Sequence, residues 1–145
     1  RSRRNLTPLS IILIDIDHFK LVNDSYGHLT GDKCIVEVAK RIKSLLRRST
    51  DVGCRYGGEE FCLILPETDA EGALALAQDI CQSTYKQQIF DDDIIIDLTV
   101  SCGVATYQQE QGVTPDIIFA SADKALYKAK QAGRNQVQVS LLSEI

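Results

Sequence analysis

Two short acidic motifs stand next to apolar runs of the chain. The first is DID at residues 15–17, directly after an apolar run, and the second is GGEE at residues 57–60, between two apolar runs. An ionised carboxylate in apolar surroundings is costly unless it is paired or bound to a cation. If the first run and the hairpin around GGEE are neighbours in one sheet, Asp15 converges with Glu59 or Glu60. Hard oxygen ligands of this kind suit Mg²⁺, which takes its remaining ligands from water and substrate phosphates.

A structural interpretation of the same motifs stays open at this point. Asp15 could cap the end of its own strand, and the two glutamates could sit at a solvated hairpin tip. Each motif alone favours that interpretation, whereas their joint presence beside buried strands favours a metal site. Asp17 shares a face with Asp15 on an extended strand, and the residues alone allow it either a ligand role or a structural role.

The segment at residues 18–32, HFKLVNDSYGHLTGD, is polar and contains glycine, which predicts a turn between the first strand and the first long helix. Backbone amides in such a turn can hold phosphate, as helix N-termini do, and Lys20 would add a point charge. Asn23 and Asp32 are chemically apt for guanine, because a carboxylate accepts from its N1 and N2 hydrogens and an amide both donates and accepts. The alternative is an N-cap role for Asp32 and a turn role for Asn23.

The composition bounds the class of protein. The chain has 145 residues, 44% of them hydrophobic and 25% charged, with a net charge of −4 and a pI near 5.1. This predicts one compact domain and argues against a general nucleic-acid or membrane-surface binder. No apolar stretch approaches the length of a membrane span. The five cysteines, an odd number without CxxC spacing, lie in apolar segments and indicate reduced core thiols of a cytoplasmic protein.

Apolar periodicity predicts the elements that must position the acidic and polar residues. In chain order we expect a buried strand at 9–16, a helix at 31–48, a two-residue hairpin at Gly57-Gly58, a second helix begun by a capping box at Thr68 and Glu71, one or two strands within 94–107, a third helix from Thr114 to about Gly133, and an edge strand at 136–139. A hairpin inside a split βαβ order predicts an α+β fold of the ferredoxin-like palm type, with a central, mostly antiparallel sheet flanked by helices.

Three segments of the chain stand out together, namely DIDHFKLVNDSYGHLTGD, RYGGEEF and ADKALYKAKQAGRN. In their order and spacing they resemble the GGDEF-domain diguanylate cyclases, and the resemblance runs from about residue 9 to residue 139. It implies a nucleotidyl-cyclase palm, akin to class III adenylate cyclases and polymerase palms. It also implies an enzyme that condenses two GTP molecules into cyclic di-GMP and releases two pyrophosphates.

The resemblance implies a metal site and a catalytic role for named residues. Mg²⁺, or Mn²⁺ in its place, would be bound by Asp15, the backbone carbonyl of Ile16 and Glu59, with assistance from Glu60. Glu59 would also deprotonate the attacking 3′-hydroxyl. Lys20 would neutralise charge on the departing pyrophosphate together with the metal.

The resemblance also implies the substrate contacts. Asn23 and Asp32 would bind guanine, with His28 nearby. The β- and γ-phosphates would be held by Lys20, the backbone amides of His18 and Phe19, and the side chains of Lys130 and Arg134.

A further match concerns Arg48 and Asp51, which resemble the RxxD site where the family binds its inhibitory product. Arginine can stack on guanine and bind phosphate. The alternative is a helix C-terminus decorated with Arg47 and Arg48, which suits the helix dipole. The spacing to Gly57 favours allosteric binding of cyclic di-GMP.

Departures from the family bear on the organisation of the protein. The family's opening helix, with its DxLTxLxNR-like motif, is not found in residues 1–145, so we expect a single catalytic domain without that helix. A larger parent protein would supply a fused sensor or receiver domain and could be membrane-anchored. The second helix carries one basic residue, Lys86, where relatives often supply another arginine to the product site.

Two copies of the domain are required for the implied reaction, because one palm carries one GTP and each 3′-hydroxyl must attack the partner's α-phosphate. The alternative to an enzyme is a non-catalytic module that senses GTP or cyclic di-GMP. A related cyclase with a different product is the third hypothesis, against which the Asn23 and Asp32 pair favours guanine.

Overall fold

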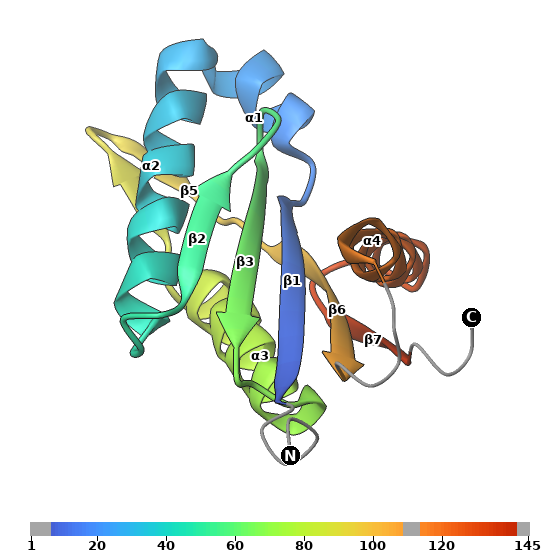
Figure 1. The fold of residues 1–145 in the computed structure, drawn as a ribbon. Helices are drawn as coiled ribbons and strands as arrows, with labels where there is room; N and C mark the ends of the chain where they lie inside the picture. The colour runs from blue at the N-terminus through green and yellow to red at the C-terminus, as the bar shows by residue number, and fades with distance from the viewer. Residues whose placement is uncertain (1–6, 109–113, 142–145) are drawn as a thin grey trace, which may run out of the picture.

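The computed structural model describes residues 7–108 and 114–141, which form a central sheet with helices on both of its faces (Figure 1). The elements are β1 (Pro8–Ile16), α1 (Phe19–Tyr26), α2 (His28–Leu45), β2 (Val52–Arg55), β3 (Glu60–Pro66), α3 (Ala70–Lys86), β4 (Ile89–Asp91), β5 (Ile94–Ile96), β6 (Val100–Gln108), α4 (Pro115–Gln131) and β7 (Val137–Leu141). Among these residues, no helix is both long and apolar enough to cross a bilayer.

The five-stranded sheet has the order β2-β3-β1-β6-β7, with β1 at its centre. β1 runs antiparallel to both β3 and β6, β2 is antiparallel to β3, and β6 and β7 pair in parallel. A mostly antiparallel central sheet flanked by helices is the α+β fold that the sequence predicts, and this prediction is confirmed.

β1 is buried on both faces, and its side chains alternate between two cores. Ile12 and Ile14 pack in the larger cluster with residues of α2 and α3, whereas Ile11 and Leu13 pack with residues of α4. Side chains two apart share a face of a strand. Asp15 therefore continues the row that faces α4, at the end of the strand.

Residues 18–32 are not the turn that the sequence predicted, because they contain the whole of α1 and the start of α2. Phe19 and Val22, three residues apart, are buried in the larger core, and their burial favours a helix over the loop that the polar composition suggested. Gly27, at a φ of 89°, separates the two helices; glycine adopts this conformation without steric cost. α2 begins and ends three residues before the predicted helix at 31–48.

Two details of turn chemistry also differ from the prediction. The hairpin connection is longer than two residues, since β2 ends at Arg55 and β3 begins at Glu60. The N-cap of α3 is Asp69 and not Thr68, and its carboxylate accepts a hydrogen bond from the Gly72 amide at 2.8 Å. Aspartate is as effective an N-cap as threonine, so the sequence allowed either start.

A second, two-stranded sheet of β4 and β5 was not predicted, and the apolar run at 94–107 divides between β5 and β6. Asp91 ties this small hairpin to α2. Its carboxylate accepts from Lys33 Nζ at 2.6 Å and from Thr30 Oγ1 at 2.7 Å. These two hydrogen bonds lower the pKa of Asp91.

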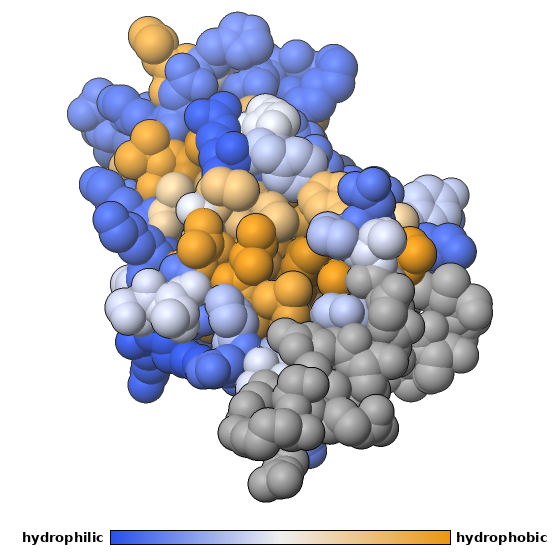
Figure 2. All heavy atoms as spheres, viewed as in Figure 1, coloured by the Kyte–Doolittle hydropathy of each residue, from blue (hydrophilic) through white to orange (hydrophobic). Residues whose placement is uncertain are grey.

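The α4 side of β2 and β3 leaves apolar side chains in contact with solvent. Val52 and Ile64, a cross-strand pair, are 52% and 37% exposed, and Figure 2 shows an apolar patch where Figure 1 places these strands.

Cys54, on the same face of β2, is also exposed. All five cysteines are free thiols and the other four are buried, so the prediction of core thiols is wrong only for Cys54.

We expect Gly103→Ala to destabilise the fold by about 3 kcal/mol, because β6 and α4 leave no room for a side chain there. An added Cβ would lie 2.3 Å from both Ala122 O and Leu126 N, and these backbone atoms cannot move aside as a side chain would. Urea unfolding measures the change. Gly58→Ala, where nothing lies within 4 Å of an added Cβ, is the matched control. Equal unfolding midpoints for the two variants would contradict the close approach of α4.

Candidate functional site

The candidate site is a pocket at the end of β1, where the hairpin between β2 and β3, the start of α1 and the end of α4 meet. Its lining combines acidic and basic groups from these elements. The lining residues are Asp15, Ile16, Asp17, His18, Phe19, Lys20, Glu59, Lys130 and Arg134. The structure thus brings together most of the residues for which the sequence predicts metal and phosphate contacts.

The two acidic motifs meet through the pairing of β1 with β3. Asp15 lies directly opposite Glu60 in the register of the two strands. The Ile16 amide donates a hydrogen bond to the Glu59 carbonyl at 3.2 Å, which fixes the hairpin loop against the end of β1. Residues that are opposite in an antiparallel pair project to the same face, so the carboxylates of Asp15 and Glu60 share one side of the sheet.

Asp15 is a buried carboxylate with one of its two oxygens satisfied. The residue is 5% exposed. Its Oδ2 forms an ion pair with Lys130 Nζ, whereas its Oδ1 is buried and has no hydrogen-bond partner within the described residues. A buried oxygen without a partner is costly, and a cation would satisfy it.

The electrostatics of the pocket favour an added positive charge. Burial raises the pKa of Asp15, Lys130 opposes this rise, and the charges of Glu59 and Asp17 add to it. Burial and the charge of Asp15 likewise raise the pKa of Glu60. One lysine therefore only partly compensates the carboxylates that meet here.

The donor set fits a hard divalent ion that keeps ligands from outside the protein. Within residues 7–108 and 114–141, no three side chains of His, Cys, Asp or Glu are close enough to enclose a metal ion. Mg²⁺ commonly binds one or two carboxylates and completes its shell with water and substrate phosphates. Asp15, Ile16 and Glu59 line the same pocket, and two carboxylates with open access to water and phosphate fit this mode of binding.

The start of α1 gives the pocket a site for anions. His18 precedes the helix in the left-handed conformation, at a φ of 55°, and both His18 and Phe19 line the pocket. Free N–H groups at a helix N-terminus attract anions. Lys20 lines the same pocket, although its Nζ is held at 2.8 Å from Asp24 Oδ2, a contact that raises the pKa of Lys20.

The residues predicted to bind guanine lie outside this pocket. Asn23 is on α1, where its Oδ1 is buried without a hydrogen-bond partner among the described residues. A Cβ on Gly31 would come within 1.9 Å of that oxygen, so the glycine makes room for the Asn23 amide between α1 and α2. Asp32 and His28 are exposed on α2, and Asp32 lines a separate groove beside the β4–β5 hairpin.

The structure excludes the two structural alternatives for these polar residues. α2 begins at His28 after Gly27, so Asp32 is not an N-cap. Asn23 is helical and not part of a turn. Among the described residues, Asn23 Oδ1 is a buried acceptor without a hydrogen-bond partner, which is a feature of ligand sites.

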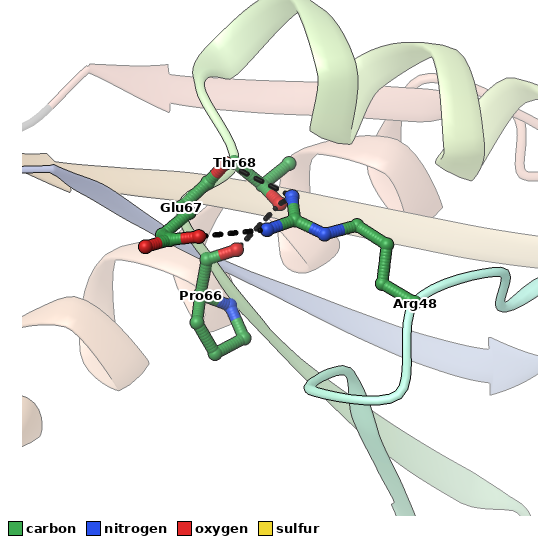
Figure 3. Close-up of polar contacts among 4 residues, drawn as sticks. All are labelled: Arg48, Pro66, Glu67 and Thr68. Carbon is green, nitrogen blue, oxygen red and sulfur yellow. Dashed lines mark hydrogen bonds and ion pairs between the residues drawn. The ribbon is translucent and has the colours of Figure 1, made fainter.

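Arg48 and Asp51 lie in the connection from α2 to β2, and both line a groove beside α2. α2 ends at Leu45, so the alternative in which Arg48 decorates the helix C-terminus is wrong. The Arg48 guanidinium donates to the Glu67 carbonyl at 3.0 Å, to Glu67 Oε1 at 3.2 Å and to Thr68 Oγ1 at 3.2 Å (Figure 3). Asp51 Oδ1 is buried without a hydrogen-bond partner among the described residues.

Asp17 differs from Asp15 in having its oxygens engaged. Its carboxylate accepts from the hydroxyls of Thr99 and Ser101 and from the backbone amide of Asn135. Sequence reasoning left the role of Asp17 open and missed these three partners. Asn135 is 118 residues away, and no local pattern could have indicated the contact.

Comparisons with known proteins give the same family. The family described as "Diguanylate cyclase, GGDEF domain" matches residues 1–136. Diguanylate cyclase A of Treponema denticola is 47% identical over 132 residues, which are 91% of this chain and 35% of that protein. Response regulator PleD of Caulobacter vibrioides is 41% identical over 132 residues, 90% of this chain and 29% of that protein. The chain thus spans about a third of the length of these curated relatives.

Solved structures are similar over nearly the whole chain. The active GGEEF domain of a diguanylate cyclase from Vibrio cholerae has a TM-score of 0.85 and 36% identity, covering 96% of this chain and 86% of that one. The GGDEF domain of DgcB from Caulobacter crescentus, in complex with c-di-GMP, has a TM-score of 0.86 and 33% identity, covering 92% of this chain and 78% of that one. These neighbours confirm the predicted cyclase palm.

We expect Asp15→Asn to raise the melting temperature of the metal-free protein at neutral pH by a few degrees. Burial and the neighbouring carboxylates raise the pKa of Asp15 above its ordinary value of 3.8, so its ionisation opposes folding at neutral pH. The difference should shrink as the pH falls through the raised pKa of Asp15, because the wild-type carboxyl then becomes protonated in the folded state. Scanning calorimetry in the presence of a chelator measures it.

Asp93→Asn, at an exposed turn position, is the control for this experiment and should leave the melting temperature unchanged. Added Mg²⁺ should stabilise the wild type and not the Asp15 variant. A lower melting temperature for the variant without metal would mean that the Lys130 ion pair outweighs the cost of burying Asp15.

Proposed function

The chain belongs to the GGDEF-domain family of diguanylate cyclases, and on this premise we propose that its domain condenses two GTP molecules into cyclic di-GMP with release of two pyrophosphates. The observation that carries the proposal is the meeting of Asp15 with Glu59 in a pocket that also contains Lys130 and Arg134, with Glu60 opposite Asp15 in the sheet. Carboxylates beside cationic side chains are the groups that metal-assisted phosphoryl chemistry needs.

The acidic end of β1 is where Mg²⁺, or Mn²⁺, would bind. Asp15, the carbonyl of Ile16 and Glu59 would hold the ion, with Glu60 beside them. The unsatisfied Oδ1 of Asp15 supports this assignment. When bound, the metal supplies charge neutralisation at the α-phosphate and on the departing pyrophosphate.

Glu59 is the candidate general base for the 3′-hydroxyl. It lies in the hairpin loop directly before β3, and its backbone carbonyl accepts from the Ile16 amide at 3.2 Å, so the loop is tied to the strand that carries Asp15. A base held close to a reacting hydroxyl can accept its proton as the new phosphodiester bond forms.

Hydrogen-bond donors from the start of α1 and the end of α4 would hold the triphosphate. The amides of His18 and Phe19 lie at the start of α1, Lys20 follows them, and Lys130 and Arg134 approach from the end of α4. Lys130 forms an ion pair with Asp15 and partly compensates its charge. Its flexible side chain can then turn to a phosphate oxygen when GTP occupies the pocket.

Guanine would be bound between α1 and α2. The buried Asn23 Oδ1 without a described hydrogen-bond partner is the supporting observation, and Gly31 leaves the space for this amide. Asp32 and His28 on α2 would complete the contacts. A buried polar group that a ligand must satisfy discriminates strongly against bases that lack the matching donor.

Two copies of the domain would assemble for turnover, because one pocket supplies one GTP. The 3′-hydroxyl of each nucleotide must then attack the α-phosphate held by the other copy. The relative PleD is named a response regulator. A similar structure, of DgcB from Caulobacter crescentus, contains a coiled coil together with the GGDEF domain. We therefore expect a regulatory domain in the parent protein to control this pairing, with the catalytic domain in the cytoplasm where GTP is available.

Arg48 and Asp51 would form an inhibitory site for cyclic di-GMP. Asp51 Oδ1 is buried without a described partner, and both residues line the groove beside α2. A guanidinium and a free carboxylate oxygen match the phosphate and the guanine edge of the product.

Glu59→Gln should lower the rate of cyclic di-GMP formation at least 100-fold, because general-base catalysis contributes that much or more. The parent protein is incubated with GTP and Mg²⁺, and the product is separated by chromatography. Glu71→Gln, at an exposed position in the first turn of α3, should retain full activity. GTP binding by the wild type without any product would instead support a sensing module, and preferential use of ATP would refute the guanine assignment.

Glu67→Gln should tighten the binding of cyclic di-GMP about two- to fivefold, the range expected for an exposed ion pair. The Glu67 carboxylate forms an ion pair with Arg48 (Figure 3), so an anionic product has to displace this carboxylate from the guanidinium. Isothermal calorimetry measures the affinity, and Glu71→Gln controls for the loss of one nearby negative charge. Arg48→Ala should abolish binding. Unchanged affinity in Arg48→Ala would refute the inhibitory site itself.

A further inference from the structure

The carboxylate of Asp17 joins three separate parts of the fold. It accepts from Thr99 Oγ1 at 2.7 Å, from Ser101 Oγ at 2.6 Å and from the Asn135 amide at 3.0 Å. Asp17 is 5% exposed, and charge-assisted hydrogen bonds in such surroundings are among the stronger ones in proteins. The end of β1 is thereby fixed to the start of β6 and to the turn between α4 and β7.

The turn between α4 and β7 has an unfavourable backbone conformation. Arg134 and Asn135 are consecutive non-glycine residues with positive φ, at 64° and 50°. The left-handed conformation costs roughly 1 kcal/mol or more per residue. Asparagine tolerates it better than other residues, whereas arginine has no such tolerance. Such a pair persists only where the surroundings determine its conformation.

The contacts that determine this turn come from both of its sides. The Arg134 amide donates to the Ala129 carbonyl at 2.9 Å, and the Gln136 carbonyl accepts from the Cys102 amide at 2.9 Å. Between them, the Asn135 amide donates to Asp17 Oδ2. Without Asp17, this amide would lose the partner that holds it toward β1.

Arg134 reaches the candidate site from this turn. Arg134 lines the same pocket as Asp15 and Lys130. A side chain on a turn is aimed by the backbone that carries it, so a change in the conformation of residues 134 and 135 would redirect the guanidinium.

We propose that Asp17 is a positioning residue for phosphate binding: its carboxylate holds the turn at residues 134–135 in the left-handed conformation and so directs Arg134 into the pocket. This inference rests on the proposed function, in which Arg134 binds the phosphates of GTP. It also separates the roles of the two aspartates. Three donors occupy the Asp17 carboxylate, whereas one oxygen of Asp15 has no hydrogen-bond partner among the described residues.

Asp17→Ala tests the proposal through the binding of a non-hydrolysable GTP analogue with Mg²⁺, measured by calorimetry on the parent protein. We expect about tenfold weaker binding of the analogue and unchanged binding of guanosine, which has no phosphates. Removal of a negative charge near the triphosphate would by itself strengthen binding. A loss of affinity therefore reports on the position of Arg134 and not on the charge of Asp17.

Two further variants separate positioning from other roles. Asp17→Asn should restore most of the affinity, because its amide oxygen can accept from the Asn135 amide while its NH₂ group donates to a hydroxyl. In an Arg134→Ala background, Asp17→Ala should cause no additional loss, since a residue that acts only through Arg134 has nothing left to position. Asp17→Ser, which leaves room for water beside the three donors, replaces Asp17→Ala if the alanine variant does not fold.

Amide hydrogen exchange at Asn135 reports on the turn without any nucleotide. Faster exchange in Asp17→Ala supports the inference, and unchanged exchange overturns it. Equal losses for guanosine and the GTP analogue, or an additional loss in the Arg134→Ala background, also overturn it. If Arg134→Ala itself leaves the affinity for the analogue unchanged, the phosphate role of Arg134 in the proposed function fails, while faster exchange would still support the hold of Asp17 on the turn.

Discussion

The burial of the Asp15 carboxylate at the end of a central strand is the constraint on which the site depends. β1 is covered on both faces, so the strand cannot move to expose this side chain. Lys130 satisfies one oxygen of Asp15 and leaves the other without a described partner. The buried negative charge of Asp15 therefore favours the binding of a cation. The large apolar core around β1 offsets the free-energy cost of burying this carboxylate.

The alternation of side chains along β1 explains how one strand serves both the core and the site. Residues at even positions pack against α2 and α3, and residues at odd positions pack against α4. Asp15 continues the odd row and so meets Lys130, which α4 contributes. The same helix leads into the turn that carries Arg134. Acid and base are therefore brought together by the packing of a single helix on a single strand.

The sequence predicted the strand, the hairpin and the approach of their acidic ends, because these depend on local apolar patterns and on pairing between neighbours in a simple sheet. It did not predict α1, whose polar surface hid the spacing of Phe19 and Val22, or the β4–β5 hairpin, whose strands have three residues each. The contacts of Asp17 with Asn135 and of Arg48 with Glu67 also escaped prediction. Such contacts depend on where the chain returns in space, which side-chain periodicity does not encode.

The register of β1 against β3 has a consequence for how this domain can vary in evolution. Asp15 is opposite Glu60, and Leu13 is opposite Cys62. Because side chains alternate, the gain or loss of one residue inside β3 would turn Glu60 to the other face of the sheet, away from Asp15. Insertions and deletions should therefore accumulate in the connections outside this pair of strands. The length of the segment from the hairpin to Pro66 should stay constant among catalytically active members of the family.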